Sequence, residues 1–284
     1  MAPLSRLLPL LCLALLASPR ARAEDTSAFA VRVKPSIVQL EALGPSGQVV
    51  SFGTGFFISE DGLVATNEHV VEGALEMQAR LPDGSTRKVL GYLARSPERD
   101  VALVKLEGTG YPALPLGVNV KVREGMKVLT MGNPLGLTFS VSEGIVSALR
   151  PDGLPEAHRY AEAAKHAMIQ VTAYSAAGAS GSPILSEDGQ VIAVLQGGMG
   201  MSSNLVFGIP VDVVAKLKAD LAPGAVPKPF KEFPLKGVVG SAVFFGLLAL
   251  AWAWSKRHEW RVARQVRRAR KARAPEAPAE EYRN

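Results

Sequence analysis

Three residues of this chain carry the side chains that together can cleave an amide bond, and each stands beside an apolar run: His69, Asp100 and Ser180. A serine hydroxyl becomes a good nucleophile only when a base removes its proton. Imidazole can take that proton and return it to the leaving group, and a carboxylate behind the ring fixes its tautomer. The sequence therefore predicts Ser180 as the nucleophile, His69 as the general base and Asp100 as the acid that orients it.

The serine lies in a glycine-rich turn, Gly178-Ala179-Ser180-Gly181-Ser182-Pro183. Glycine has no Cβ, so a ligand can come close to the backbone there. The backbone N–H groups of Gly178 and Ser180 can then point at one place and stabilise an oxyanion. These two residues are the predicted oxyanion hole.

Each of the three residues also has a plain structural interpretation. His69 can simply end a strand, Asp100 can cap one, and Ser180 can belong to an ordinary turn. The chain order histidine, aspartate, serine favours the catalytic interpretation. That order is typical of chymotrypsin-type double barrels and differs from the order in subtilisin-like and α/β-hydrolase folds.

Short β-rich runs separated by glycine turns must position these residues, a pattern typical of an all-β barrel or sandwich. The predicted strands are 36–43, 49–58, 63–66, 77–81, 86–93, 101–106, 127–131, 140–149, 168–173, 184–185, 191–196 and 205–209. A looser stretch with three glycines and two prolines, 107–117, predicts a linker between two lobes. An amphipathic helix is expected over 211–221, and 155–167 is expected to form a helical or mobile excursion.

Both ends of the chain have the composition of targeting segments. Residues 1–23 have an early arginine, a short apolar run and a small-x-small ending, as in a secretory signal peptide; an uncleaved anchor is the alternative. A proline-rich spacer over 223–235 precedes an apolar segment, 236–254, long enough to span a bilayer. The alternative for that segment is a buried core helix. The basic tail, 255–284, should remain in the cytoplasm and leave the large preceding region outside.

Charge and cysteine content exclude several classes of function. The net charge of +6 divides into +3 for the signal segment, +6 for 256–284 and −3 for 24–255. The excess positive charge therefore belongs to the ends, and nucleic-acid binding by the large region is not expected. Anionic lipid is the expected partner of the tail, with a cytoplasmic protein or RNA as the alternative. The single cysteine, Cys12, lies in the signal segment, so no disulfide is expected. No metal or other cofactor is expected.

The chain resembles the HtrA/Deg family of trypsin-like serine proteases over about residues 28–221. The resemblance is carried by Gly53–Ile58, Thr66–Val71, Asp100–Leu106, Met131–Gly136, Gly144–Ser147 and Gly178–Pro183. It implies a protease domain over 24–222 made of two six-stranded antiparallel barrels, one over about 28–107 and one over about 118–221, with the site in the crevice between them. It also implies that His69, Asp100 and Ser180 form the triad and that Gly178 and Ser180 form the oxyanion hole.

The sequence departs from the family pattern around the serine and after the domain. The family usually has asparagine and glycine where Ala179 and Ser182 stand here, and both replacements are small enough to preserve the turn. We expect a protein without a PDZ domain, in which membrane anchoring takes the place of that module. The family often forms trimers through aromatic residues near the mature N-terminus, which makes Phe29 a candidate contact in a possible homotrimer.

The combined expectation is a membrane-anchored serine endopeptidase that acts on unfolded or damaged extracytoplasmic polypeptides, on the periplasmic side of a bacterial inner membrane. We expect the substrate pocket to favour small or medium apolar side chains, because no acid lies among its predicted walls, Tyr174, Ala177, Gln196, Gly197 and Gly198. One alternative is a catalytically silent chaperone or stress-sensing module on the same fold. Another is a membrane-organising protein that acts through its tail.

Overall fold

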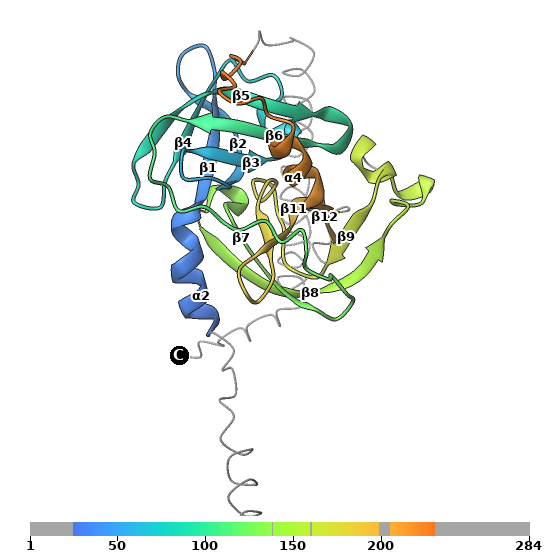
Figure 1. Ribbon diagram of the computed structural model, residues 1–284. Helices are drawn as coiled ribbons and strands as arrows, with labels where there is room; N and C mark the ends of the chain where they lie inside the picture. Colours follow the sequence, from blue (N-terminus) through green and yellow to red (C-terminus); the bar gives the residue numbers. More distant parts are fainter. Residues whose placement is uncertain (1–24, 138, 160, 199–204, 231–284) are drawn as a thin grey trace, which may run out of the picture. The chain divides into compact units, whose positions relative to one another are not determined.

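The β-rich runs close into two antiparallel barrels in the computed structural model, which describes residues 25–137, 139–159, 161–198 and 205–230 (Figure 1). In the first barrel the strand order is β1-β2-β3-β6-β5-β4. Its strands are β1 (Ile37–Leu43), β2 (Val49–Phe57), β3 (Leu63–Thr66), β4 (Glu76–Arg80), β5 (Thr86–Ser96) and β6 (Val101–Leu106). This agrees with the expected all-β class and with the predicted strands.

The second barrel repeats the design with the order β10-β11-β12-β9-β8-β7. Its strands are β7 (Lys127–Gly132), β8 (Ser140–Arg150), β9 (Met168–Val171), β10 (Pro183–Leu185), β11 (Val191–Gly198) and β12 (Val206–Pro210). The connection between the barrels contains the predicted linker and has Tyr111 stacked on Phe57, with ring centroids 4.2 Å apart. The loop that carries Ser180 joins β9 to β10, so it belongs to the second barrel.

Helices are few among the described residues, and two of them connect the barrels to the flanking chain. Helix α4 (Asp212–Ala219) forms where amphipathicity predicts it and packs against both β6 and β12. Helix α2 (Thr26–Val33) begins at Asp25, whose carboxylate accepts a hydrogen bond from the Ser27 backbone N–H. The described residues of the 155–167 segment form two short 3₁₀ turns, η5 (Glu156–His158) and η6 (Glu162–Lys165).

The burial of Phe29 on α2 contradicts its predicted role as a trimer contact. Its side chain is 3% exposed and belongs to the core cluster that also contains Phe56 of the first barrel and Phe207 of the second. The guanidinium of Arg32 lies 5.0 Å from its ring centroid. Because burial of its ring already stabilises this chain's own core, Phe29 is not available to bind a second copy.

The core extends across both barrels. One cluster joins residues of the first barrel, such as Phe56 and Leu103, to Met131 and Phe207 of the second. Each barrel also has its own filled interior. Burial of this shared apolar surface packs the two barrels against each other, so residues at their junction keep fixed relative positions.

An ion pair joins Asp61, in the turn before β3, to Lys105 on β6, and its contribution to stability depends on pH. Lys105 Nζ lies 2.7 Å from Asp61 Oδ2, and the side chain of Asp61 is 62% exposed. Hydrogen bonding from Lys105, and then from Ser59, holds the pKa of Asp61 below its usual value.

Part of the predicted spacer packs against the first barrel. Residues 226–230, called here the C-terminal strap, run beside β5, where Lys228 and Tyr92 exchange backbone hydrogen bonds of 3.0 and 2.8 Å. The Phe230 ring centroid lies 6.2 Å from that of Tyr92. Gly91 makes this approach possible, because a Cβ there would lie 2.2 Å from the Lys228 carbonyl oxygen.

The predicted signal peptide, 1–23, the predicted membrane span, 236–254, and the basic tail, 255–284, lie outside the described residues. Among the helices that the structure describes, none is both long and apolar enough to cross a bilayer.

Candidate active site

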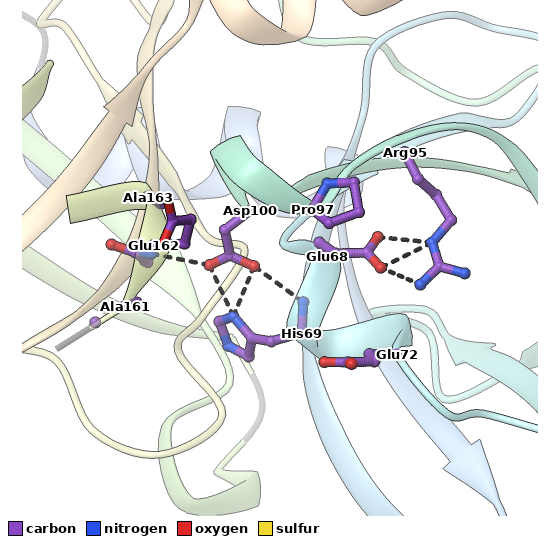
Figure 2. Close-up of a pocket in the computed structure, with 11 residues that line it drawn as sticks. Glu68, His69, Glu72, Arg95, Pro97, Asp100, Ala161, Glu162 and Ala163 are labelled. Carbon is purple, nitrogen blue, oxygen red and sulfur yellow. Dashed lines mark hydrogen bonds and ion pairs between the residues drawn. The ribbon is translucent and has the colours of Figure 1, made fainter. Parts of the chain in front are cut away.

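His69 and Asp100 meet at the end of the first barrel that faces the second. His69 lies on α3 (Glu68–Val71), a single helical turn that follows β3, so the histidine belongs to a short helix and does not end a strand. Its Nδ1 lies 2.8 Å from Asp100 Oδ2 and 3.0 Å from Oδ1 (Figure 2). A carboxylate only accepts hydrogen bonds, so Nδ1 carries the ring proton and Nε2 is left to accept one.

The backbone around Asp100 presents its carboxylate to the ring. The 3₁₀ turn η3 (Pro97–Arg99) ends at Asp100, which has φ 53° and ψ 46°, a left-handed conformation that aspartate tolerates. Its Oδ1 also accepts a 2.9 Å hydrogen bond from the His69 backbone N–H, and its carbonyl accepts one from Asn67 Nδ2. Asp100 is 6% exposed, so these donors replace the water that burial removes.

The Asp100 carboxylate receives a third donor, after the His69 ring and backbone, from the second barrel. Gln196 Nε2 on β11 donates a 3.1 Å hydrogen bond to Asp100 Oδ2. The backbone carbonyl of the same glutamine accepts a 3.0 Å hydrogen bond from Ser180 Oγ. Gln196 therefore connects the predicted acid to the predicted nucleophile across the junction of the barrels. Sequence reasoning had placed Gln196 on a pocket wall and missed this bond.

The turn at Ser180 leaves two backbone donors free. Gly178 has φ 91°, a left-handed conformation that favours glycine. Among the described residues, the Gly178 and Ser180 N–H groups have no hydrogen-bond acceptor. Ser180 Oγ donates a hydrogen bond to the Gln196 carbonyl. Among the described residues it makes no hydrogen bond to His69. Such a turn can hold an anionic oxygen on two N–H groups.

A cavity of about 620 Å³ opens beside the imidazole. It is lined by Glu68, His69, Glu72, Arg95, Pro97, Asp100, Ala161, Glu162, Ala163, Gln196 and Gly197. Of the five predicted pocket residues, Gln196 and Gly197 line this cavity. Tyr174, which is 50% exposed, and Ala177 lie outside its lining, and Gly198 ends β11. The η6 turn contributes to the wall, which the sequence did not indicate.

An ion pair braces the helix that carries the histidine. Both carboxylate oxygens of Glu68, which is 5% exposed, accept hydrogen bonds from Arg95 on β5, at 2.8 Å from its Nε (Figure 2). The hydrogen bonds that Arg95 donates to Glu68 raise the pKa of Arg95, so its guanidinium stays charged at any pH of interest. Arg95 also lies 5.0 Å from the centroid of the Tyr92 ring.

Comparison with known proteins identifies the family of this chain. The sequence profile of the trypsin-like peptidase domain matches residues 53–194, which is half of the chain and includes all three candidate residues. The mitochondrial serine protease HTRA2 of Bos taurus is 36% identical over 206 residues, which cover 69% of this chain and 43% of that protein.

The chain belongs to the HtrA family of trypsin-like serine proteases.

Other relatives resemble the same part of this HtrA chain. The "Probable periplasmic serine endoprotease DegP-like" of Halomonas elongata is 36% identical over 186 residues, 63% of this chain and 38% of that protein. The solved structure of the HtrA-type protease AlgW with a tripeptide superposes with a TM-score of 0.59 at 27% identity, covering 68% of this chain and 62% of that one. The chain thus spans about two fifths of the length of the curated relatives that it matches.

Two buried polar residues belong to the surroundings of the Ser180 turn, although the sequence did not indicate them as parts of the site. Thr54 on β2 and Asn133 after β7 are both 0% exposed and hydrogen-bonded to each other. The available signal was a polar residue inside each of two apolar motifs, Gly53–Ile58 and Met131–Gly136. A buried polar side chain needs partners, and here the partners include the turn that carries Ser180.

Proposed function

We propose that this HtrA-type chain is a serine endopeptidase in which Ser180, His69 and Asp100 hydrolyse peptide bonds through an acyl-enzyme. One observation carries the proposal. Gln196 donates its side-chain amide to the buried Asp100 and accepts the Ser180 hydroxyl on its carbonyl, while Asp100 holds His69 Nδ1. These bonds support a triad whose base and acid come from the first barrel and whose nucleophile comes from the second.

The first half of the reaction uses groups that are already in place. Ser180 Oγ turns from the Gln196 carbonyl to His69 Nε2, gives up its proton and attacks the scissile carbonyl carbon. The oxygen of that carbonyl becomes an anion and accepts hydrogen bonds from the Gly178 and Ser180 N–H groups, each worth about 3 kcal/mol of barrier. His69 returns the proton to the departing amine when the C–N bond breaks.

The second half regenerates the enzyme. Water gives a proton to His69, and the resulting hydroxide attacks the acyl carbon. The proton passes from His69 to Ser180 as the ester bond breaks, leaving a free carboxylic acid. Asp100 remains a carboxylate throughout and stabilises the transient imidazolium, which its two contacts to the His69 ring and backbone allow.

We also propose that the substrates are unfolded or damaged extracytoplasmic polypeptides. The support is the composition of the two ends and the periplasmic name of the Halomonas relative. In this proposal residues 236–254 anchor the protein, 255–284 contact anionic lipid from the cytoplasmic side, and the protease domain faces outward. A homotrimer remains a prediction.

A catalytically silent binding or chaperone module is the second candidate. One observation favours it: Ser180 Oγ is hydrogen-bonded to Gln196 and not to His69 within the described residues. In the enzyme this arrangement is a resting state, from which the Ser180 hydroxyl turns toward His69 for the reaction. In the silent module it would be permanent.

Labelling with a fluorophosphonate separates the two candidates. We expect the full chain in detergent to form a covalent adduct and to cleave casein, because the probe reacts only with an activated serine. Ser180→Ala should abolish both, and His69→Ala should abolish both while leaving the fold intact by circular dichroism. An unlabelled wild-type chain that still binds unfolded casein would refute the enzyme and support the silent module.

A further inference from the structure

Thr54 occupies a fully buried position where the first barrel touches the turn that carries the serine. Its hydroxyl makes three hydrogen bonds: it donates to Gly178 O at 2.8 Å and accepts from Asn133 N at 3.0 Å and from Asn133 Nδ2 at 3.2 Å. One donor and two lone pairs are all that a hydroxyl has. Every hydrogen-bonding site of this side chain is therefore in use.

The backbone of Thr54 holds the same turn. Its N–H donates a 2.8 Å hydrogen bond to Ser180 O, and its own carbonyl is held by Thr66 Oγ1 at 2.7 Å. Gly181 fits between these groups, since a Cβ there would lie 2.0 Å from Thr54 O. A side chain and a backbone group of one first-barrel residue thus fix the carbonyls of both Gly178 and Ser180.

The partner of Thr54 extends the contact to a second loop. Asn133, which is 0% exposed, also donates from Nδ2 to Val38 O at 3.2 Å and accepts the Phe139 N–H on Oδ1 at 3.0 Å. Two residues further on, Leu135 has φ 55°, a conformation uncommon outside glycine, and this loop geometry costs energy that the Asn133 bonds offset.

That loop aims the first oxyanion donor. The Leu135 N–H donates a 2.6 Å hydrogen bond to Ala177 O. A trans peptide is planar, so holding Ala177 O on one side points the Gly178 N–H to the opposite side. The Ser180 N–H is aimed in the same way, because Ala179 O accepts hydrogen bonds from Ser182 N and Ser182 Oγ at 3.0 and 2.6 Å.

We infer that Thr54 is a positioning residue whose hydroxyl keeps the oxyanion hole open by joining the Ser180 turn to the Asn133 loop. This inference rests on the proposed function of that turn. Without the hydroxyl, Gly178 O and the two Asn133 donors lose their shared partner, and the Ala177–Gly178 peptide is free to rotate its N–H away from the substrate. Thr54 itself touches no reacting atom, and its effect is on the transition state alone.

The decisive pair of variants is Thr54→Val and Thr54→Ser in the full chain. Valine keeps the size of threonine and removes the hydroxyl, whereas serine keeps the hydroxyl. We expect Thr54→Val to lower kcat/KM for a peptide substrate about 100-fold, the range for loss of one oxyanion donor, with KM within threefold of wild type. Thr54→Ser should remain within about threefold of wild type in both constants.

Three further measurements separate positioning from a general loss of structure. A peptide aldehyde, whose adduct places an oxyanion in the hole, should bind Thr54→Val weaker by the same factor as the loss in kcat/KM. Affinity for an uncleaved peptide, measured in a Ser180→Ala background, should not change. Amide hydrogen exchange should accelerate around 133–137 and 176–182 in Thr54→Val and not in Thr54→Ser.

Equal kcat/KM for Thr54→Val and wild type, or equal losses for the two variants, would overturn the inference. If Thr54→Val does not fold, Asn133→Ala removes the other half of the contact and should lower kcat about tenfold in a folded protein; wild-type kcat there would also overturn it. The exchange measurement needs no activity. An inactive wild-type chain would therefore refute the proposed function, while unchanged exchange in Thr54→Val would refute the role of Thr54 separately.

Discussion

Replacing Arg95 with methionine should strongly destabilise the helix that carries the candidate base. Glu68 is 5% exposed and receives both of its carboxylate contacts from this arginine, so the variant leaves a buried charge without a partner. Breaking a buried pair in this way typically costs about 3–5 kcal/mol. The Arg95 side chain is 28% exposed, so water relieves part of the penalty and we expect a cost near the lower end, about 3 kcal/mol.

Urea and thermal unfolding of the full chain measure this cost. For a domain of this size, a loss of about 3 kcal/mol corresponds to a Tm lower by roughly 6–12 °C. Arg95→Lys is the matched control: it keeps a charge but not the two-pronged contact, and should lose about 1 kcal/mol. The double variant Glu68→Gln/Arg95→Met removes the uncompensated charge and should recover most of the stability lost by Arg95→Met.

The refuting result is specific. If Arg95→Met and the double variant lose the same free energy of unfolding, then the cost comes from lost packing against Tyr92 and not from an unpaired carboxylate. If neither variant is destabilised by more than about 0.5 kcal/mol, the range of surface substitutions, the pair does not brace α3 at all.

Three further outcomes are expected. Gly181→Ala should cost more than about 3 kcal/mol by urea unfolding, because its methyl group would lie 2.0 Å from a backbone oxygen, whereas Gly84→Ala, at a similar positive φ but with open space around it, should cost only about 1–2 kcal/mol. Gln196→Leu removes one donor from the Asp100 carboxylate and should lower kcat/KM about tenfold in a peptide assay; an unchanged rate would show that the other donors suffice. Asp61→Asn should cost less than about 1 kcal/mol at pH 7, since the Asp61 carboxylate is exposed. Because the folded-state pKa of Asp61 is lowered, that stability is present above the usual carboxyl pKa and lost as the pH falls through the lowered pKa, so the unfolding curves of variant and wild type should converge in acid.

The strands were predictable because their signals are local. The ranges of β3 and β6 match the prediction residue for residue, since apolar runs between turn residues mark both ends of each strand. β5 continues three residues past its predicted end, to Ser96, because pairing with β6 extends it. Helix α4 was likewise readable from its amphipathic pattern.

Long-range contacts could not be predicted in the same way. The bond from Gln196 to Asp100 joins residues 96 positions apart, and it forms only because β11 and η3 meet where the barrels pack together. Phe29 could be recognised as an aromatic residue near the start of the domain, but its burial depends on core residues from both barrels. His69 was identified by its type and neighbours, while its place on α3 follows from the turn after β3.

The C-terminal strap sets a practical limit on how this HtrA-family chain can be shortened. A fragment that stops at residue 222 would discard Lys228 and Phe230, strip the backbone partner from Tyr92, and expose apolar surface on an edge of β5 that invites aggregation. Recombinant work on the two-barrel part should therefore keep the chain through at least Phe230, because the C-terminal strap contacts β5 beyond the end of α4.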